Sequence, residues 1–144
     1  MNSDIAQILL VEDNQDDYDA TLRSLKKNHL INPVHWCKNG QEAMDYLKSK
    51  EAENQKPSLI LLDLNMPGID GRQVLERIKS DPKLRAIPVI ILTTSSDNRD
   101  VEQCYNIGAS TYIQKPVSFE GLTEAIRTMK DYWFNVAILP NNDN

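Results

Sequence analysis

Short runs of apolar residues constrain this chain more than any other feature of its sequence. Four of them cover residues 8–11, 59–62, 89–92 and 111–113. An unbroken apolar run of this length, bounded by polar or turn residues, is typical of a strand buried on both faces of a parallel sheet. A fifth candidate, 33–37, alternates apolar and polar residues, and we expect it at a half-exposed edge.

Between these runs, the apolar residues recur with a helical period. The clearest case is the last segment, where steps of three and four residues separate Phe119, Leu122, Ile126, Met129 and Trp133. This spacing places the five side chains on one face of a single helix. Earlier segments around residues 18–25, 43–47, 74–78 and 101–105 show the same period.

Strands that alternate with helices predict an α/β fold, a doubly wound (βα)5 parallel sheet with helices on both faces, in three layers. Five strands and five helices fit residues 5–134. A length of 144 residues also suits one domain. We therefore expect a single domain over 1–144, with an apolar tail at 135–140 and a frayed polar end at 141–144.

The charge and composition exclude several classes of protein. With 21 acidic and 16 basic residues, the net charge of −5 predicts a poor binder of nucleic acid or anionic membrane. The longest apolar runs are four residues, far short of the about 20 that span a bilayer. The first residues lack the features of a signal peptide. Cys37 and Cys104 have no metal-binding spacing, so we expect reduced, buried thiols in a cytoplasmic protein.

Charged and hydroxyl residues follow the expected strands at the point where each strand ends. Glu12 and Asp13 follow the first strand, Asp63 the third, Thr93 the fourth and Lys115 the fifth. Ligands of doubly wound sheets bind at the carboxyl ends of the strands. These five side chains are therefore expected to line one crevice.

Their chemistry predicts a metal-assisted phosphoryl site. Three carboxylates at close range repel one another, so a bound cation would stabilise them. Oxygen ligands in a small site favour a hard cation such as Mg²⁺. We expect Asp13 and Asp63 to be ligands and Glu12 to hold a coordinated water. Asp63 can then attack phosphorus as a nucleophile, while Thr93 and Lys115 bind the other phosphoryl oxygens.

Each residue taken alone has a simpler interpretation. Asp13 or Asn14 can cap the first helix, and Asp63 can be a turn residue. Thr93 can be a helix cap or a strand residue, and Lys115 a solvated charge. The functional interpretation depends on all of them falling at carboxyl strand ends in order.

Four segments together resemble the receiver domain of two-component response regulators. They read LLVED at 9–13, LLDLNMPGIDG at 61–71, PVIILT at 88–93 and GASTYIQKP at 108–116. The resemblance covers nearly the whole chain. It implies a flavodoxin-like sheet with strand order 2-1-3-4-5.

The resemblance also implies roles for individual residues. Asp63 would accept a phosphoryl group from a sensor histidine kinase, beside the acidic pocket of Glu12 and Asp13. The backbone carbonyl of Asn65 would be a further ligand of Mg²⁺. The bond between Lys115 and Pro116 would be a cis peptide.

Signalling would follow from a conformational switch. In the family, the residue corresponding to Thr93 moves toward the phosphoryl group, and the aromatic residue corresponding to Tyr112 turns inward. An unidentified downstream protein would read the new state. Because only residues 135–144 follow the last expected helix, we expect no DNA-binding output domain.

Two features are similar to stand-alone regulators that work with bacterial, especially cyanobacterial, phytochrome kinases. One is the long polar connector at 51–58, and the other is the apolar tail. The tail includes Trp133, Phe134, Ile138 and Leu139. These side chains can cover the domain's own helices, or they can form a homodimer interface together with the last helix.

The sequence is also compatible with two alternative functions. A phosphorylation-independent binding module would need a vestigial acidic site. A phosphatase with an aspartyl nucleophile usually needs a second aspartate two residues later, where this chain has Asn65. An asparagine cannot transfer a proton, so we expect a phosphoacceptor and not an enzyme with an external substrate.

Overall fold

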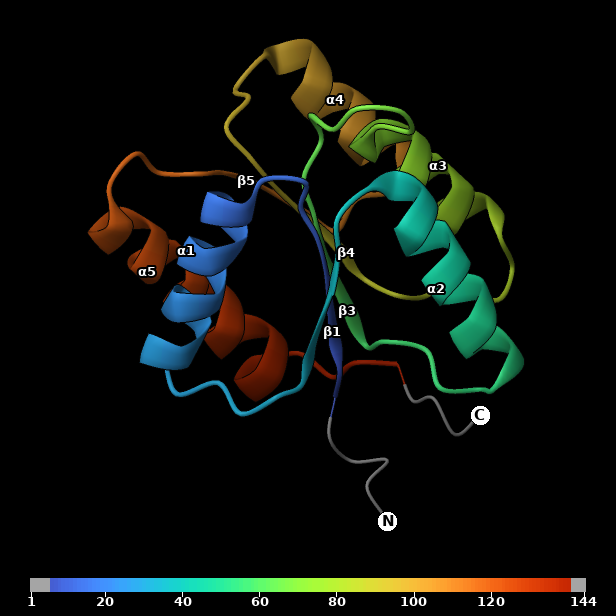
Figure 1. The fold of residues 1–144 in the computed structure, drawn as a ribbon, viewed down its shortest axis with the longest axis horizontal. Helices are drawn as coiled ribbons and strands as arrows, with labels where there is room; N and C mark the ends of the chain where they lie inside the picture. Colours follow the sequence, from blue (N-terminus) through green and yellow to red (C-terminus); the bar gives the residue numbers. More distant parts are fainter. Residues whose placement is uncertain (1–5, 141–144) are drawn as a thin grey trace.

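A single sheet of five parallel strands forms the centre of the computed structural model, which describes residues 6–140 (Figure 1). The strands pair in the order β2-β1-β3-β4-β5, as predicted. Their bounds differ from the expected ones by one residue at most. The strands are β1 (Ile8–Val11), β2 (Val34–Cys37), β3 (Leu59–Leu62), β4 (Val89–Thr93) and β5 (Thr111–Gln114).

Helices cover both faces of the sheet, which confirms the three layers. Helices α1 and α5 lie on one face, and α2, α3 and α4 lie on the other (Figure 1). Within residues 6–140, no helix combines the length and the apolar character that a bilayer span needs. The helices are α1 (Gln15–Lys27), α2 (Gly40–Ala52), α3 (Gly71–Ser80), α4 (Asn98–Ile107) and α5 (Phe119–Lys130).

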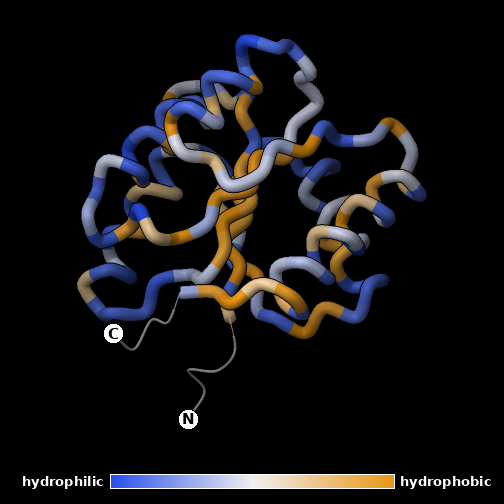
Figure 2. Tube along the Cα trace, turned by 180° about the vertical axis from the view of Figure 1, so that it is seen from behind, coloured by the Kyte–Doolittle hydropathy of each residue, from blue (hydrophilic) through white to orange (hydrophobic). Residues whose placement is uncertain are grey.

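Alternate side chains of each central strand enter different cores. On β1, Leu9 and Val11 pack with α2, α3 and α4, whereas Ile8 and Leu10 pack with α1 and α5. All four residues are buried, so the strand has no polar face. The apolar band through the middle of Figure 2 is this sheet, and it fixes the register that brings the strand ends together.

The end of the last helix differs from the prediction of one continuous helix through Trp133. Helix α5 ends at Lys130 and passes into a wider π-helical segment, η2 (Asp131–Val136). Within the tail, Trp133, Phe134 and Leu139 pack on the domain's own core, whereas Ile138 is 97% exposed. The expected frayed end at 141–144 lies outside the described residues.

Both cysteines are free and buried, as expected. Cys37 ends β2, and Cys104 lies on α4. Burial raises the pKa of the Cys37 thiol to about 12. Burial also raises the pKa of the Cys104 thiol, so both side chains favour the thiol over the reactive thiolate.

Candidate functional site

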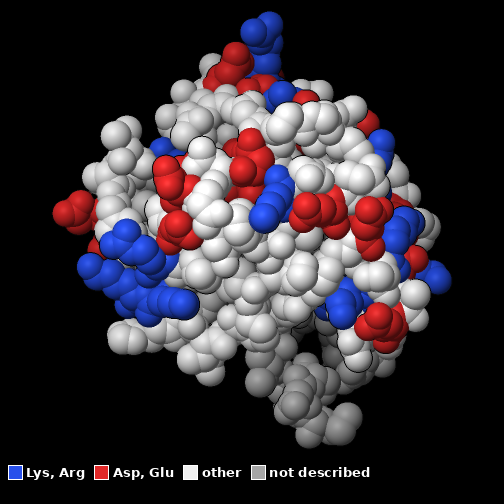
Figure 3. Space-filling view, viewed as in Figure 1, with Lys and Arg blue, Asp and Glu red and all other residues white. Residues whose placement is uncertain are grey.

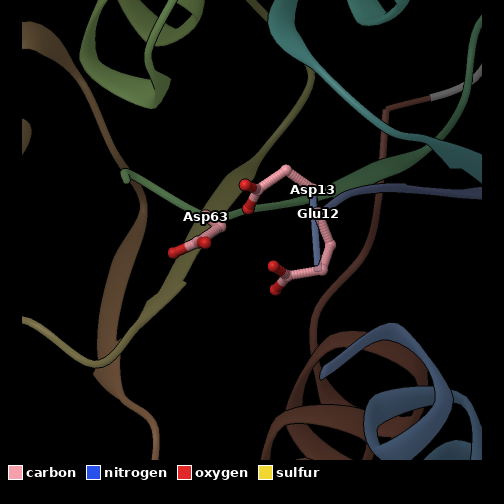
Figure 4. A group of neighbouring side chains, drawn as sticks. All are labelled: Glu12, Asp13 and Asp63. Carbon is pink, nitrogen blue, oxygen red and sulfur yellow. The ribbon is translucent and has the colours of Figure 1, made fainter. Parts of the chain in front are cut away.

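The structure brings the three predicted carboxylates together at the carboxyl edge of the sheet. Glu12 and Asp13 follow β1, and Asp63 follows the neighbouring strand β3. One carboxylate oxygen from each lies within 4.8 Å of the other two (Figure 4). Glu12 and Asp63 are buried, whereas Asp13 is exposed, so solvent reaches the group from the Asp13 side.

Glu12 is held by two partners through its carboxylate. Lys115 Nζ lies 2.5 Å from Oε1, and the backbone N–H of Asn14 donates to Oε2 over 3.2 Å. Burial raises the pKa of Glu12 to about 7, although the bond from Lys115 opposes this rise. Burial alone would lower the pKa of Lys115, but Glu12 and the charge of Asp63 raise it above its ordinary value. The ammonium therefore stays charged and neutralises part of the acidic group.

Helix α1 begins directly after this acidic loop. The Asn14 side chain caps it by accepting a hydrogen bond of 2.9 Å from the N–H of Asp17. The alternative that Asp13 is the cap is therefore wrong. Asp13 is left to face the carboxylate group.

Asp63 is fixed by the turn that follows β3. Its Oδ1 accepts a hydrogen bond of 2.9 Å from the N–H of Leu64. A Cβ atom at Gly71 would lie 2.1 Å from the carbonyl oxygen of Asp63, so only glycine fits at the start of α3. Gly71 also donates its N–H to the Leu64 carbonyl. Sequence reasoning assigned no role to Gly71, although it directly follows the helix cap Asp70.

Thr93 ends β4 with its side chain fully buried. Its Oγ1 has no hydrogen-bond partner within residues 6–140. A buried hydroxyl without a partner loses about 1–3 kcal/mol of solvation. The fold thus leaves one buried polar atom unsatisfied at the end of β4, the strand that pairs with β3 and so neighbours the strand before Asp63.

Tyr112 lies half-buried on β5, next to β4 in the sheet. Its hydroxyl donates to the backbone carbonyl of Ser95 over 3.0 Å. The ring packs against the core beneath α4. Tyr112 is therefore attached to the β4–α4 loop, two residues beyond Thr93.

A charged contact that no sequence pattern indicates holds the same loop. The Ser95 hydroxyl donates to Oδ2 of Asp100, and Arg72 Nη1 donates to Oδ1, each over 2.8 Å. Arg72 lies on α3 and Asp100 on α4. No spacing rule predicts a pair 28 residues apart, so only the fold could find it.

The expected cis peptide between Lys115 and Pro116 is wrong for this structure, in which residues 6–140 hold no cis bond. The trans isomer of a bond before proline is intrinsically favoured by about 0.5–1 kcal/mol. With the bond trans, the Lys115 N–H still donates to the Thr93 carbonyl over 2.6 Å. The Lys115 ammonium reaches Glu12 and, at 3.5 Å, Asp17.

The residues present fit a small divalent cation. Three carboxylates converge, and hard oxygen donors of this kind are the ligands that Mg²⁺ and Mn²⁺ prefer. One lysine cannot balance three carboxylates. Burial is the main cause of the raised pKa of Glu12, and the charge of Asp63 adds to it. A divalent cation between Asp13 and Asp63 would offset that negative charge.

Comparisons with known proteins agree with this geometry. Residues 8–127 match the family model described as the response regulator receiver domain. The chain is 39% identical over 127 residues to the probable methanogenesis regulatory protein FilR2 of Methanothrix harundinacea, covering 88% of this chain and 82% of that protein. It is 37% identical over 135 residues to the response regulator Rcp1 of Synechocystis, covering 92% of each.

Solved structures show the same likeness. The phosphorylated cyanobacterial phytochrome response regulator RcpA matches with a TM-score of 0.87 at 38% identity, over 94% of this chain and 98% of that one. The Mn²⁺-bound form of Rcp1 matches with a TM-score of 0.85 at 36% identity, over 94% and 99%. Sequence, fold and site thus lead to one conclusion: this chain belongs to the response regulator receiver domain family.

Proposed function

We propose that this protein accepts a phosphoryl group on Asp63 from a sensor histidine kinase and passes the signal on by a change of conformation. The observation that carries the proposal is the convergence of Glu12, Asp13 and Asp63 beside the unpartnered hydroxyl of Thr93. That group of donors matches what a phosphoryl group and its cation need.

In the proposed reaction, a carboxylate oxygen of Asp63 attacks the phosphorus of a phosphohistidine. A new P–O bond forms as the P–N bond breaks, and the electron pair of that bond stays on the imidazole. The hydrogen bond from Leu64 to Oδ1 orients the carboxylate and leaves Oδ2 for the attack. The product is an aspartyl phosphate, which water later hydrolyses.

The proposed metal is Mg²⁺, held by Asp13, Asp63 and the backbone carbonyl of Asn65, with Glu12 acting through a coordinated water. When bound, it neutralises the phosphoryl oxygens. Lys115 supplies the second positive charge. Its present bond to Glu12 keeps the ammonium within the pocket until a phosphoryl oxygen competes for it.

The proposed switch lies on the opposite side of the pocket. A phosphoryl oxygen on Asp63 would give the Thr93 hydroxyl the partner that it lacks. Movement of Thr93 would pull the β4–α4 loop, to which the Tyr112 hydroxyl is bonded. The phosphoryl group would thus favour an inward state of Tyr112 as a shift of population.

We propose a phytochrome as the kinase, because RcpA is described as a phytochrome response regulator and the chain resembles it over 94% of its length. A groove of about 450 Å³ beside the site offers a docking place. It is lined by Asp17 and Thr21 of α1 and by Pro116, Val117 and Phe119 after β5. Figure 3 shows a basic group at one side of this face, over the last turn of α1, which carries Lys26 and Lys27.

We also propose a homodimer through the tail. Tyr132 and Val136 of η2 and Ile138 of the tail expose 51%, 70% and 97% of their surface, so three apolar side chains of this segment are left uncovered. Trp133, Phe134 and Leu139 of the same segment pack on the domain's own core. Sedimentation at high micromolar concentration should show a dimer, and a pure monomer with and without phosphoryl transfer would contradict it.

Incubation with acetyl phosphate and Mg²⁺ tests the central proposal. We expect an acid-labile adduct of one phosphoryl group by intact mass, none without a divalent cation and none in Asp63→Asn. An exposed control, Asp45→Asn on α2, should behave as wild type. An adduct that persists in Asp63→Asn would contradict the assignment.

The same experiment separates the two other functions. A phosphorylation-independent binding module would take up no phosphoryl group, and its partner affinity would not change with beryllofluoride. A phosphatase would turn over many equivalents of a small phosphate ester. The exposed amide of Asn65, two residues after Asp63, gives no general acid for such turnover.

A further inference from the structure

The backbone of Glu12 is fixed by the neighbouring strand β2. Its N–H donates to the Cys37 carbonyl over 3.0 Å, and its carbonyl accepts from the indole Nε1–H of Trp36 over 2.8 Å. The first bond belongs to the ordinary pairing of parallel strands. The second comes from a side chain, and it holds the peptide that joins Glu12 to Asp13.

Trp36 is itself held in place from the other side. Its ring stacks on Tyr18, with centroids 3.8 Å apart and planes 6° apart. The ammonium of Lys38 lies 5.2 Å from the indole centroid. Tyr18 belongs to the first turn of α1, which begins directly beyond the acidic loop. The indole thus ties β2, the acidic loop and α1 into one unit.

We propose that Trp36 is a positioning residue for the metal site. A peptide unit is planar, so a bond that fixes the Glu12 carbonyl also fixes the direction in which the chain enters Asp13. Asp13 is the exposed member of the carboxylate group, and its orientation depends on this backbone more than on packing. The inference rests on the proposed function, because it concerns the cation that the reaction uses.

Trp36→Phe tests the proposal because phenylalanine keeps a ring for Tyr18 to stack on but removes the donor. Partners that orient metal ligands from outside the coordination sphere typically change affinity by about 10–100-fold. Trp36 acts through a backbone, so we expect the lower end, about tenfold weaker Mg²⁺ binding by calorimetry. The Mg²⁺ concentration that gives half of the maximal rate of phosphorylation by acetyl phosphate should rise correspondingly. At saturating Mg²⁺ the rate should equal that of wild type.

Trp133→Phe is the matched control, because it makes the same substitution in η2, among residues that pack with α5. Its Mg²⁺ affinity should equal that of wild type. A merely structural role for Trp36 would lower the melting temperature and leave the Mg²⁺ affinity unchanged. Folded Trp36→Phe with an affinity within twofold of wild type would therefore overturn the inference.

A second measurement serves if Trp36→Phe does not fold. In Trp133→Phe, Trp36 is the remaining tryptophan, since the chain has two. The fluorescence emission of Trp36 should change as Mg²⁺ is added, and the midpoint of that titration should match the dissociation constant from calorimetry. Emission that stays constant would overturn the inference. Wild-type protein that binds no Mg²⁺ would overturn the proposed function as well, whereas equal binding by wild type and Trp36→Phe overturns the inference alone.

Discussion

The two loops that flank Asp63 differ in how completely their polar atoms are satisfied. In the β1–α1 loop, the N–H, the carbonyl and both carboxylate oxygens of Glu12 have partners. At the start of the β4–α4 loop, the Thr93 hydroxyl is buried and has no partner within the described residues. The buried glutamate on one side of the site thus has all its hydrogen bonds before any ligand binds, and the buried hydroxyl on the other side does not.

This difference shows how a small domain can bind and respond at the same site. A satisfied, rigid loop holds carboxylates in place for a cation without further reorganisation. An unsatisfied hydroxyl gains a hydrogen bond only when a phosphoryl oxygen arrives, so binding favours its movement. We therefore expect metal binding to depend on the β1–α1 side and signalling to depend on the β4–α4 side.

The largest effect should come from Asp13→Asn on the β1–α1 side. It removes one of two proposed direct carboxylate ligands, so Mg²⁺ affinity by calorimetry should fall by more than the about 10–100-fold cost of losing an outer partner. Asp19→Asn is a matched control on the exposed face of α1. Unchanged Mg²⁺ affinity in Asp13→Asn would show that the carboxylate group is not the metal site.

Lys115→Met should have the next largest effect. Glu12 is 2% exposed and loses the cation beside it, and breaking a buried pair costs about 3–5 kcal/mol. Urea unfolding should show a loss at the lower end of that range, because Asn14 still donates to Glu12. Lys48→Met breaks the solvent-exposed pair with Asp81 and should destabilise the protein much less, because water screens that pair. Equal losses in the two variants would show that the site is not preorganised by its buried pair.

Thr93→Val should change the stability of the protein in the opposite direction. It replaces an unpartnered hydroxyl by a methyl group of the same shape, so the free energy of unfolding should rise by about 1 kcal/mol. The same variant should bind beryllofluoride more weakly. Thr94→Val, at the exposed neighbour, should change stability by less than about 0.5 kcal/mol. Destabilisation by Thr93→Val would mean that the hydroxyl is already satisfied.

Arg72→Gln should have the smallest effect on stability. The pair with Asp100 is about three-quarters shielded, and such pairs contribute at most about 1 kcal/mol. Amide exchange at residues 94–97 should nevertheless become faster, because Asp100 holds Ser95 through the same carboxylate. Arg99→Gln removes a pair whose arginine is 93% exposed and should leave that exchange unchanged. Equal exchange in both variants would show that the Arg72 contact does not restrain the loop.

The sequence predicted what depends on local pattern. Unbroken apolar runs predicted the strands, and apolar residues at helical spacing predicted the helices. The rule that ligands bind at the carboxyl ends of the strands of a doubly wound sheet placed Asp13 and Asp63 at one edge. The same reasoning could not predict bonds between distant segments. Trp36 reaches Glu12 from 24 residues away, and its spacing suggested only an edge strand.

Two further expectations are wrong, and one residue of the site was missed. The resemblance implied a cis bond at Pro116, whereas here the trans bond coexists with the contact between Lys115 and Glu12. The apolar stripe continued to Trp133, but helical spacing does not distinguish an α-helix from the π-helical segment that follows Lys130. Gly71 was visible in the sequence, yet its reason is a contact of its backbone with Asp63 that only the folded chain reveals.

A crystal structure with Mn²⁺ and beryllofluoride would show whether the cation and the phosphoryl group share this site. Mn²⁺ gives an anomalous signal, and beryllofluoride on a carboxylate stands in for the phosphoryl group. We expect one Mn²⁺ between Asp13 and Asp63, beryllofluoride on Asp63, and the Thr93 hydroxyl moved to within hydrogen-bonding distance of a fluorine. No Mn²⁺ at these residues, or a Thr93 hydroxyl that stays where it is while Asp63 carries the group, would contradict it.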